Sequence, residues 1–128
     1  VAIDTSGSVS NDDLREFISE IHHIWKTGTE VTVVECDAQI GRVYEYKGSI
    51  DDSKQVTGRG GTDMNPFIEY FNDHREFNSL IILTDGYIGE NTVKTFKPMM
   101  MVICSNGEDI ETVKENGWGH TIKISLAS

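Results

Sequence analysis

The chain has 128 residues, of which 38% are hydrophobic and 25% are charged, and this composition is typical of one globular domain over residues 1–128. Its formal net charge of −10 argues against nucleic acid and anionic membrane surfaces as partners, because both are bound by basic faces. No apolar run approaches the roughly 20 residues that span a bilayer, so we expect no membrane segment.

Two cysteines, Cys36 and Cys104, each end an apolar run. They form neither a disulfide scaffold nor a zinc motif, and we expect both to be buried and reduced, as in a cytoplasmic protein. The chain lacks an initiator methionine and begins inside an expected strand. We therefore expect it to be a fragment of a longer protein.

The first apolar residues, Val1 to Ile3, predict the end of a buried strand. Ser10 and Asp13 have the spacing of a capping box, which predicts the start of a helix. Apolar residues then recur at helical spacing as far as Gly28, a residue type favoured just after a helix. A strand, a loop and a helix are therefore expected within the first 28 residues.

The next segment predicts a strand pair. Residues 30–36 are rich in β-branched side chains, which predicts a strand buried on both faces. After a turn at 37–39, residues 41–47 alternate in polarity and predict an antiparallel edge strand. Residues 48–57 are expected to form a connection, with a short strand near 54–57.

Asn65 is predicted to cap a helix that starts at Pro66 and ends near His74. Further expected elements are strands over 79–84, 99–104 and 120–126, a short helix near 90–96 and a weak helix over 108–116. Strands that alternate with helices predict an α/β fold with a mostly parallel central sheet of about six strands, one antiparallel edge strand and helices on both faces.

Oxygen-bearing side chains gather in three loops of this fold. Asp4, Ser6 and Ser8 follow the first strand, Thr62 lies in a glycine-rich loop, and Asp85 follows a later buried strand. Ligands of doubly wound sheets bind outside the carboxyl ends of strands, where the strand order reverses. Hard oxygen ligands collected there would suit a divalent cation such as Mg²⁺.

The segments Asp4-x-Ser6-x-Ser8, Thr62 and Thr84-Asp85-Gly86, in this order, resemble the metal-ion-dependent adhesion site of von Willebrand factor type A (VWA) domains. The resemblance spans nearly the whole chain and implies a three-layer, Rossmann-like fold with strand order 3-2-1-4-5-6. Such an order would place two strands between Cys36 and Cys104, too far apart for a disulfide.

A narrower resemblance concerns Cys36-Asp37-Ala38 and Gly60-Gly61-Thr62-Asp63. These segments are similar to those of bacterial VWA-like domains that lie downstream of a metallopeptidase region. The chain would then be an accessory domain of such a protein.

The resemblance implies a role for each residue of the site. Ser6 and Ser8 would bind Mg²⁺, or alternatively Mn²⁺ or Ca²⁺, through their hydroxyls, and Thr62 would do so directly or through water. Asp4 and Asp85 would supply negative charge. One coordination position would remain for an Asp or Glu of a protein partner, which makes the chain a binding module and not an enzyme.

Asp63 has two open interpretations: it accepts a hydrogen bond behind the metal ligands, or its charge favours the start of the following helix. A Mg²⁺-dependent phosphohydrolase that uses Asp4 is an alternative function, although its familiar pattern needs a second aspartate where Ser6 stands. A domain that keeps the fold without using a metal is a further alternative. Ser6 and Ser8 would then be turn and capping hydroxyls.

Asp37 is explained by turn chemistry. The adjacent residues His22 and His23 cannot share a helix face, so we expect them to be structural or at the surface.

Overall fold

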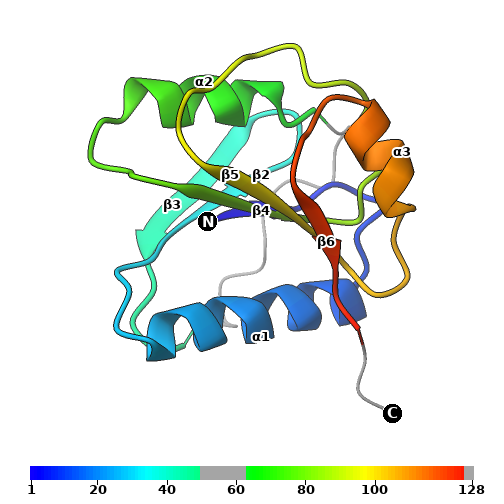
Figure 1. Ribbon diagram of the computed structural model, residues 1–128. Coiled ribbons are helices and arrows are strands. Elements are labelled where there is room, and N and C mark those ends of the chain that lie inside the picture. The colour runs from blue at the N-terminus through cyan, green and yellow to red at the C-terminus, as the bar shows by residue number, and fades with distance from the viewer. Residues whose placement is uncertain (50–62, 126–128) are drawn as a thin grey trace.

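The computed structural model describes residues 1–49 and 63–125, and in this part a six-stranded sheet has the order β3-β2-β1-β4-β5-β6 (Figure 1). β1 pairs in parallel with β2 and β4, and β4, β5 and β6 continue the parallel arrangement. β3 is the antiparallel edge strand. The strands are β1 (Ala2–Asp4), β2 (Thr32–Cys36), β3 (Ile40–Glu45), β4 (Leu80–Thr84), β5 (Met99–Ile103) and β6 (Thr121–Lys123). The predicted strand order and fold class are confirmed.

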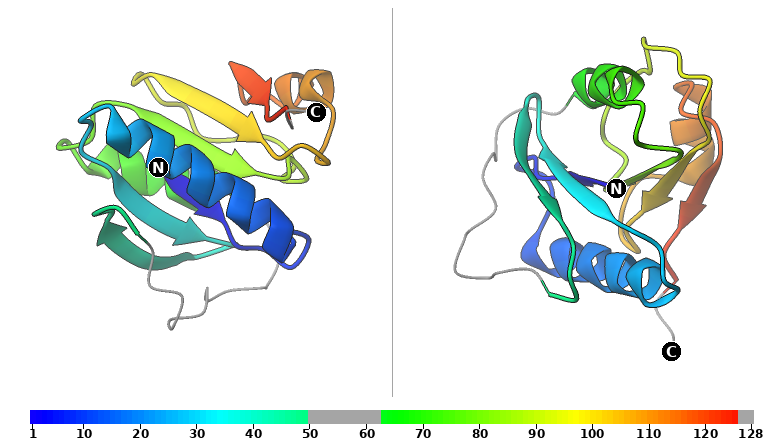
Figure 2. Two further views of the ribbon diagram at one scale, coloured as in Figure 1. Left: turned by 90° about the horizontal axis from the view of Figure 1, so that it is seen from below. Right: turned by 90° about the vertical axis from the view of Figure 1, so that its left-hand side faces the viewer.

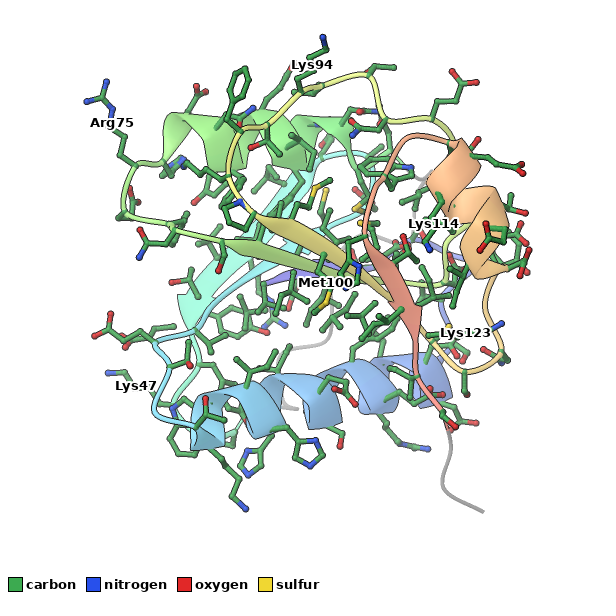
Figure 3. All side chains as sticks on the ribbon, viewed as in Figure 1. Lys47, Arg75, Lys94, Met100, Lys114 and Lys123 are labelled. Atoms are coloured by element: carbon green, nitrogen blue, oxygen red, sulfur yellow. The ribbon has the colours of Figure 1, made fainter. Side chains whose placement is uncertain are left out.

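Helices cover both faces of the sheet, as Figures 1 and 2 show. Helix α1 (Asn11–Lys26) lies on one face, α2 (Asn65–Asp73) lies on the other, and the side chain of Met100 projects toward α1 (Figure 3). Helix α3 (Ile110–Glu115) packs beside β6 and contributes Val113 to the core on the α2 face. Two hydrophobic cores result, one on each face of the sheet.

The start of α1 follows the sequence signal. Ser10 caps the helix: its hydroxyl accepts a hydrogen bond from the Asp13 amide, and the Asp13 carboxylate accepts one from the Ser10 amide. Such a reciprocal pair satisfies two amides that the first helical turn leaves without partners. Gly28, at φ +92°, follows the end of the helix as predicted.

Two predictions about the middle of the chain are wrong. Asn65 does not cap α2 but is its first residue, after Met64, because the Asn65 side chain bonds outward to Glu90 O at 3.0 Å and to the Thr92 amide at 2.7 Å. No helix forms over 90–96. There the amides of Thr92 and Val93 bond to asparagine side chains, and these bonds replace the helical ladder.

Other predictions differ only in their boundaries, which fall within two residues of those observed for the strands predicted at 30–36, 41–47, 79–84 and 99–104. The short strand expected near 54–57 lies outside the described residues. Cys36 and Cys104 are both free and buried, as expected. Within the described ranges, no helix has the length and apolar character needed to cross a membrane.

Candidate metal centre

The candidate site lies at the carboxyl end of the two central strands. Asp4 is the last residue of β1, and Asp85 follows the last residue of β4, its parallel neighbour. From β1 the chain continues through α1 to β2 on one side, and from β4 it continues to β5 on the other. The strand order therefore reverses between Asp4 and Asp85, where ligands of such sheets bind.

Asp4 is fully buried, and both of its carboxylate oxygens accept hydrogen bonds. Oδ1 accepts the amide of Ser6 at 2.9 Å, and Oδ2 accepts the hydroxyl of Thr84 at 2.6 Å. The Thr84 hydroxyl also accepts the amide of Gly86 at 3.1 Å, so one threonine connects the ends of β1 and β4. The carboxylate is thus held in one orientation.

Thr84 received no role from the sequence, although it stands directly before Asp85. The sequence signal that could have indicated this role is the hydroxyl of Thr84 at the end of its predicted strand, which the expected strand order places beside the strand that carries Asp4. Only the pairing of β1 with β4 brings these residues, 80 positions apart, into contact.

The two serines lie side by side in the loop after β1. Ser6 is buried and Ser8 is exposed, and their hydroxyl oxygens are 3.3 Å apart. Neighbouring ligands of an octahedral Mg²⁺, each about 2.1 Å from the ion, are separated by roughly 3.0 Å. The two hydroxyls are therefore spaced closely enough to bind one cation.

Asp85 is buried, with 3% of its surface exposed. Its Oδ1 accepts the amide of Tyr87 at 3.1 Å, whereas its Oδ2 is buried without a hydrogen-bond partner among the described residues. Gly86, at φ +87°, makes this turn possible, because a Cβ there would lie 2.8 Å from the Cβ of Glu108. Among the described residues, this carboxylate oxygen is therefore buried and accepts no hydrogen bond.

The electrostatic setting of these carboxylates is strongly negative. Burial raises the pKa of Asp4; hydrogen bonds from Ser6 and Thr84 oppose the shift, and the charge of Asp85 adds to it. Burial also raises the pKa of the neighbouring Cys36 thiol to about 12, with contributions from Asp4, Asp37 and Asp63. A cation at this end of the sheet would relieve the repulsion among these groups.

Thr62 lies outside the described residues, so its predicted role as a ligand stays a prediction. Asp63 is described and exposed, and its Oδ1 accepts the Asn65 amide at 3.0 Å and the Asn65 side chain at 2.9 Å. These bonds favour the interpretation in which Asp63 supports the start of α2. Its backbone amide donates to Asp37 O at 3.1 Å, which holds Asp63 beside the end of β2.

Residues expected to be structural have structural partners. The Asp37 Oδ1 accepts the amides of Ala38 at 2.6 Å and Gln39 at 3.0 Å, a turn arrangement. The Nδ1 of His22 lies 2.7 Å from the hydroxyl of Tyr46. Within the described residues, no group of three or more His, Cys, Asp or Glu side chains is placed to hold a metal, so the candidate centre depends on its serine hydroxyls as well as its carboxylates.

The donor set fits a hard divalent cation. Asp4 and Asp85 supply carboxylate oxygens, and Ser6 and Ser8 supply neutral hydroxyls. Mg²⁺ prefers oxygen ligands and usually keeps several waters, so a few protein ligands suffice. The Oδ2 of Asp85, which has no hydrogen-bond partner in the part of the chain that the structure describes, could bind such a cation or a water attached to it.

Comparison with known proteins gives a family for the chain. The family model described as "VWA-like domain (DUF2201)" matches residues 1–125. An uncharacterized protein of Thermotoga maritima is 27% identical over 114 residues. The match covers 88% of this chain but 28% of that relative's length. No solved structure matches.

Proposed function

Because the chain belongs to the VWA-like domain family, and because its sheet ends in buried carboxylates and paired hydroxyls, we propose that it is a divalent-metal-dependent protein-binding module. Asp4, Ser6, Ser8 and Asp85, together with Thr62, would hold Mg²⁺. The ion would dock a carboxylate of the partner.

The observation that carries this proposal is the buried Oδ2 of Asp85, which has no hydrogen-bond partner among the described residues. Leaving a buried carboxylate oxygen without a partner costs of the order of 1–3 kcal/mol or more. Asp4 lies close enough for the charge of Asp85 to raise its pKa. A cation between Asp4 and Asp85 would give the buried carboxylate oxygen a partner and would replace the repulsion between the two carboxylates with attraction to the ion.

Each side chain has a distinct task in this proposal. Thr84 and the Ser6 amide hold the Asp4 carboxylate in place, and Ser6 and Ser8 offer adjacent hydroxyl ligands. A partner would approach from the side on which Ser8 is exposed. Bound Mg²⁺ would supply positive charge that attracts an Asp or Glu side chain, which a chain of net charge −10 otherwise repels.

Calorimetric titration of Mg²⁺ into the wild type and an Asp85→Asn variant tests the metal site, with Asp73→Asn as a matched control. Asp73 is an exposed aspartate at the end of α2. We expect binding to the wild type and the control, and at least a ten-fold loss, about 1.4 kcal/mol, in Asp85→Asn. At a Mg²⁺ concentration near 100 times the Kd, the wild type should gain about 2.7 kcal/mol of stability.

The result that contradicts the metal site is equal Mg²⁺ binding, or equal lack of binding, in the wild type and Asp85→Asn. Repeating the titration with Mn²⁺ and Ca²⁺ ranks the cations. Selection of displayed peptides in Mg²⁺ and in EDTA then tests the partner. Peptides retained only in Mg²⁺ should contain an Asp or Glu whose amide substitution abolishes retention.

The chain corresponds to 28% of the length of its Thermotoga maritima relative, so the module would act within a longer protein. An accessory role beside a metallopeptidase in a bacterial cytoplasm belongs to this proposal. Reading the residues that adjoin the chain in its gene, and locating the protein in fractionated cells, tests both points.

A further inference from the structure

Exposed hydrophobic side chains are few in the described part of the chain, and one of them stands at the candidate metal centre. The large ones are Val43, Tyr87, Phe96 and Ile122. Tyr87 follows Asp85 by two residues, and 54% of its surface is exposed. Tyrosine is enriched at the positions that contribute most to protein interfaces, because its ring offers a large contact area at a low entropic cost. The Tyr87 ring is therefore a candidate contact for a partner that reaches the metal centre.

The backbone that carries Tyr87 is fixed on both sides. The Tyr87 amide donates to Asp85 Oδ1 at 3.1 Å. The next residue, Ile88, is 3% exposed and belongs to the core on the α2 face. Gly89 O then accepts the Nε1 of the buried Trp118 at 2.7 Å. Because this backbone is already ordered, a contact made by the ring would cost little further conformational entropy.

Acidic side chains lie next to Tyr87. The Glu108 amide donates to Asp85 O at 2.7 Å, and a Cβ at Gly86 would lie 2.8 Å from the Cβ of Glu108. Glu108 therefore adjoins the residue before Tyr87. Glu90, three residues after Tyr87, is exposed. Within residues 1–49 and 63–125, neither Glu90 nor Glu108 forms an ion pair.

Lys123 brings a positive charge to the same end of the sheet. Its ammonium donates to Gly107 O at 2.9 Å, so it is held by the loop between β5 and α3. Asp109 and Glu111, which follow Glu108, are exposed and add negative charge. With a net charge of −10 on the whole chain, the surroundings of the metal centre favour a positively charged group on a partner.

Phe96 shows what the opposite surroundings look like. Its side chain is fully exposed, at 102%, and it lies between Lys94 and Lys97 in the sequence. Lys94 projects outward from the connection between β4 and β5 (Figure 3). The Lys97 ammonium donates to Phe71 O and His74 O, each at 2.9 Å, at the end of α2. The two exposed aromatic rings of this connection thus have neighbours of opposite charge.

We propose that Tyr87 binds a lysine or arginine side chain of the partner, close in the partner's sequence to the Asp or Glu that reaches the metal. This inference rests on the proposed metal-dependent binding function. A cation over the face of an aromatic ring is attracted to its π electrons, and the charges of Glu90 and Glu108 add to that attraction.

The spacing along the chain limits how far apart the two partner residues can be. The Cα atoms of Asp85 and Tyr87 are separated by at most about 7 Å, which two residues of an extended partner segment also span. The partner would therefore present an acidic and a basic residue within about three positions of each other. Such a segment would also meet less repulsion from this chain than a purely acidic one.

Selection of displayed peptides tests this proposal with the wild type, Tyr87→Ala and, as a matched control, Phe96→Ala. Both substitutions remove an exposed aromatic ring, so both variants should fold. Among peptides retained only in Mg²⁺, we expect the wild type and Phe96→Ala to enrich a basic residue within about three positions of an Asp or Glu. Tyr87→Ala should lose that enrichment, and Tyr87→Phe, which keeps the ring, should retain it.

A selected peptide then gives the size of the effect. Replacing its basic residue with Gln should weaken Mg²⁺-dependent binding to the wild type about three-fold or more, with a smaller change for Tyr87→Ala. No enrichment of basic residues on the wild type, or equal enrichment on Tyr87→Ala, would overturn the proposal.

Calorimetric titration of Mg²⁺ into Tyr87→Ala separates the ring from the metal centre. If peptide preference is lost while Mg²⁺ affinity is kept, the effect belongs to the ring. A parallel loss of Mg²⁺ affinity would assign it to the metal centre and contradict the role of Tyr87. If the wild type retains no peptide only in Mg²⁺, the proposed binding function itself fails, and this inference fails with it.

Discussion

Two buried carboxylates of this domain have opposite surroundings. Glu35, with 1% of its surface exposed, accepts two hydrogen bonds from the Arg42 guanidinium and one, at 3.3 Å, from the hydroxyl of Tyr44. Asp85, with 3% exposed, accepts one backbone amide and keeps Oδ2 unpartnered among the described residues. Within that same part of the chain, no ion pair involves Asp4 or Asp85.

Among the described residues, Glu35 has a cationic partner within the chain, whereas Asp85 has none. A buried charge is tolerated when it is paired and hydrogen-bonded, and at Glu35 the chain supplies the partners itself. The described residues provide no cationic partner for the Asp85 carboxylate, and the nearby Asp4 adds a second negative charge. In the proposed function, a bound cation would supply the missing partner.

The largest expected effect is the loss of stability when Glu35 loses its ion-pair partner Arg42. Arg42→Met leaves Glu35 buried without its cation, and breaking such a pair typically lowers the free energy of unfolding by about 3–5 kcal/mol. Arg42 is 23% exposed, so we expect a value near the lower limit, about 3 kcal/mol. Urea unfolding, monitored by circular dichroism, measures this loss.

Arg15→Met is the matched control for Arg42→Met, because Arg15 pairs with Asp12 at the surface, where both side chains are more than three-quarters exposed. It should change stability by no more than about 0.5 kcal/mol. Similar losses in the two variants would show that the buried Arg42–Glu35 pair contributes no more stability than a surface pair. The contrast between a stabilised Glu35 and Asp85 would then be wrong.

A smaller effect should appear in the pH dependence of the metal centre. Burial, with the charge of Asp85, raises the pKa of Asp4, so the folded protein holds that proton more tightly than the unfolded chain. The metal-free protein should therefore lose stability as the pH rises from the ordinary aspartate pKa, about 3.9, through the raised value. Saturating Mg²⁺ should oppose this loss, because it favours the ionised carboxylate.

Thermal unfolding over a pH series, in EDTA and in Mg²⁺, checks this prediction. An Asp4→Asn variant should lack the contribution that Asp4 makes to the pH dependence under both conditions. Parallel profiles with and without Mg²⁺ in the wild type would mean that the cation does not interact with ionised Asp4.

The smallest expected effect is the loss of stability when Glu35 loses its hydrogen bond from Tyr44. Tyr44→Phe removes the hydroxyl that donates to Glu35, but the Arg42 pair remains. At 3.3 Å this hydrogen bond is long, so we expect a loss of about 0.5–1 kcal/mol in urea unfolding. A loss as large as that of Arg42→Met would mean that the hydroxyl, and not the guanidinium, is the main partner of Glu35.

Local signals in the sequence predicted most of the fold. A run of β-branched residues predicted β2, a run of apolar residues predicted β4, and Ser10 with Asp13 predicted the start of α1, because these signals act within a few residues. The helix predicted near 90–96 does not form, because a residue distant in the sequence intervenes. Asn65, far away in the chain, accepts the Thr92 amide that a helix would have used.

The sequence by itself predicted which residues could form a cation site: Asp4, Ser6 and Ser8 at and after the end of the first strand, Thr62 in a glycine-rich loop, and Asp85 after a later strand. It did not show whether Asp85 or Glu35 would have a cationic partner, since both are acidic residues in or beside apolar strands. Tertiary structure decided that difference. Antiparallel pairing brings β3, with Arg42, alongside β2, whereas parallel pairing of β1 with β4 brings together two carboxylates and a single threonine hydroxyl. Whether a buried charge is paired depends on side chains from other strands, and only the assembled sheet places them.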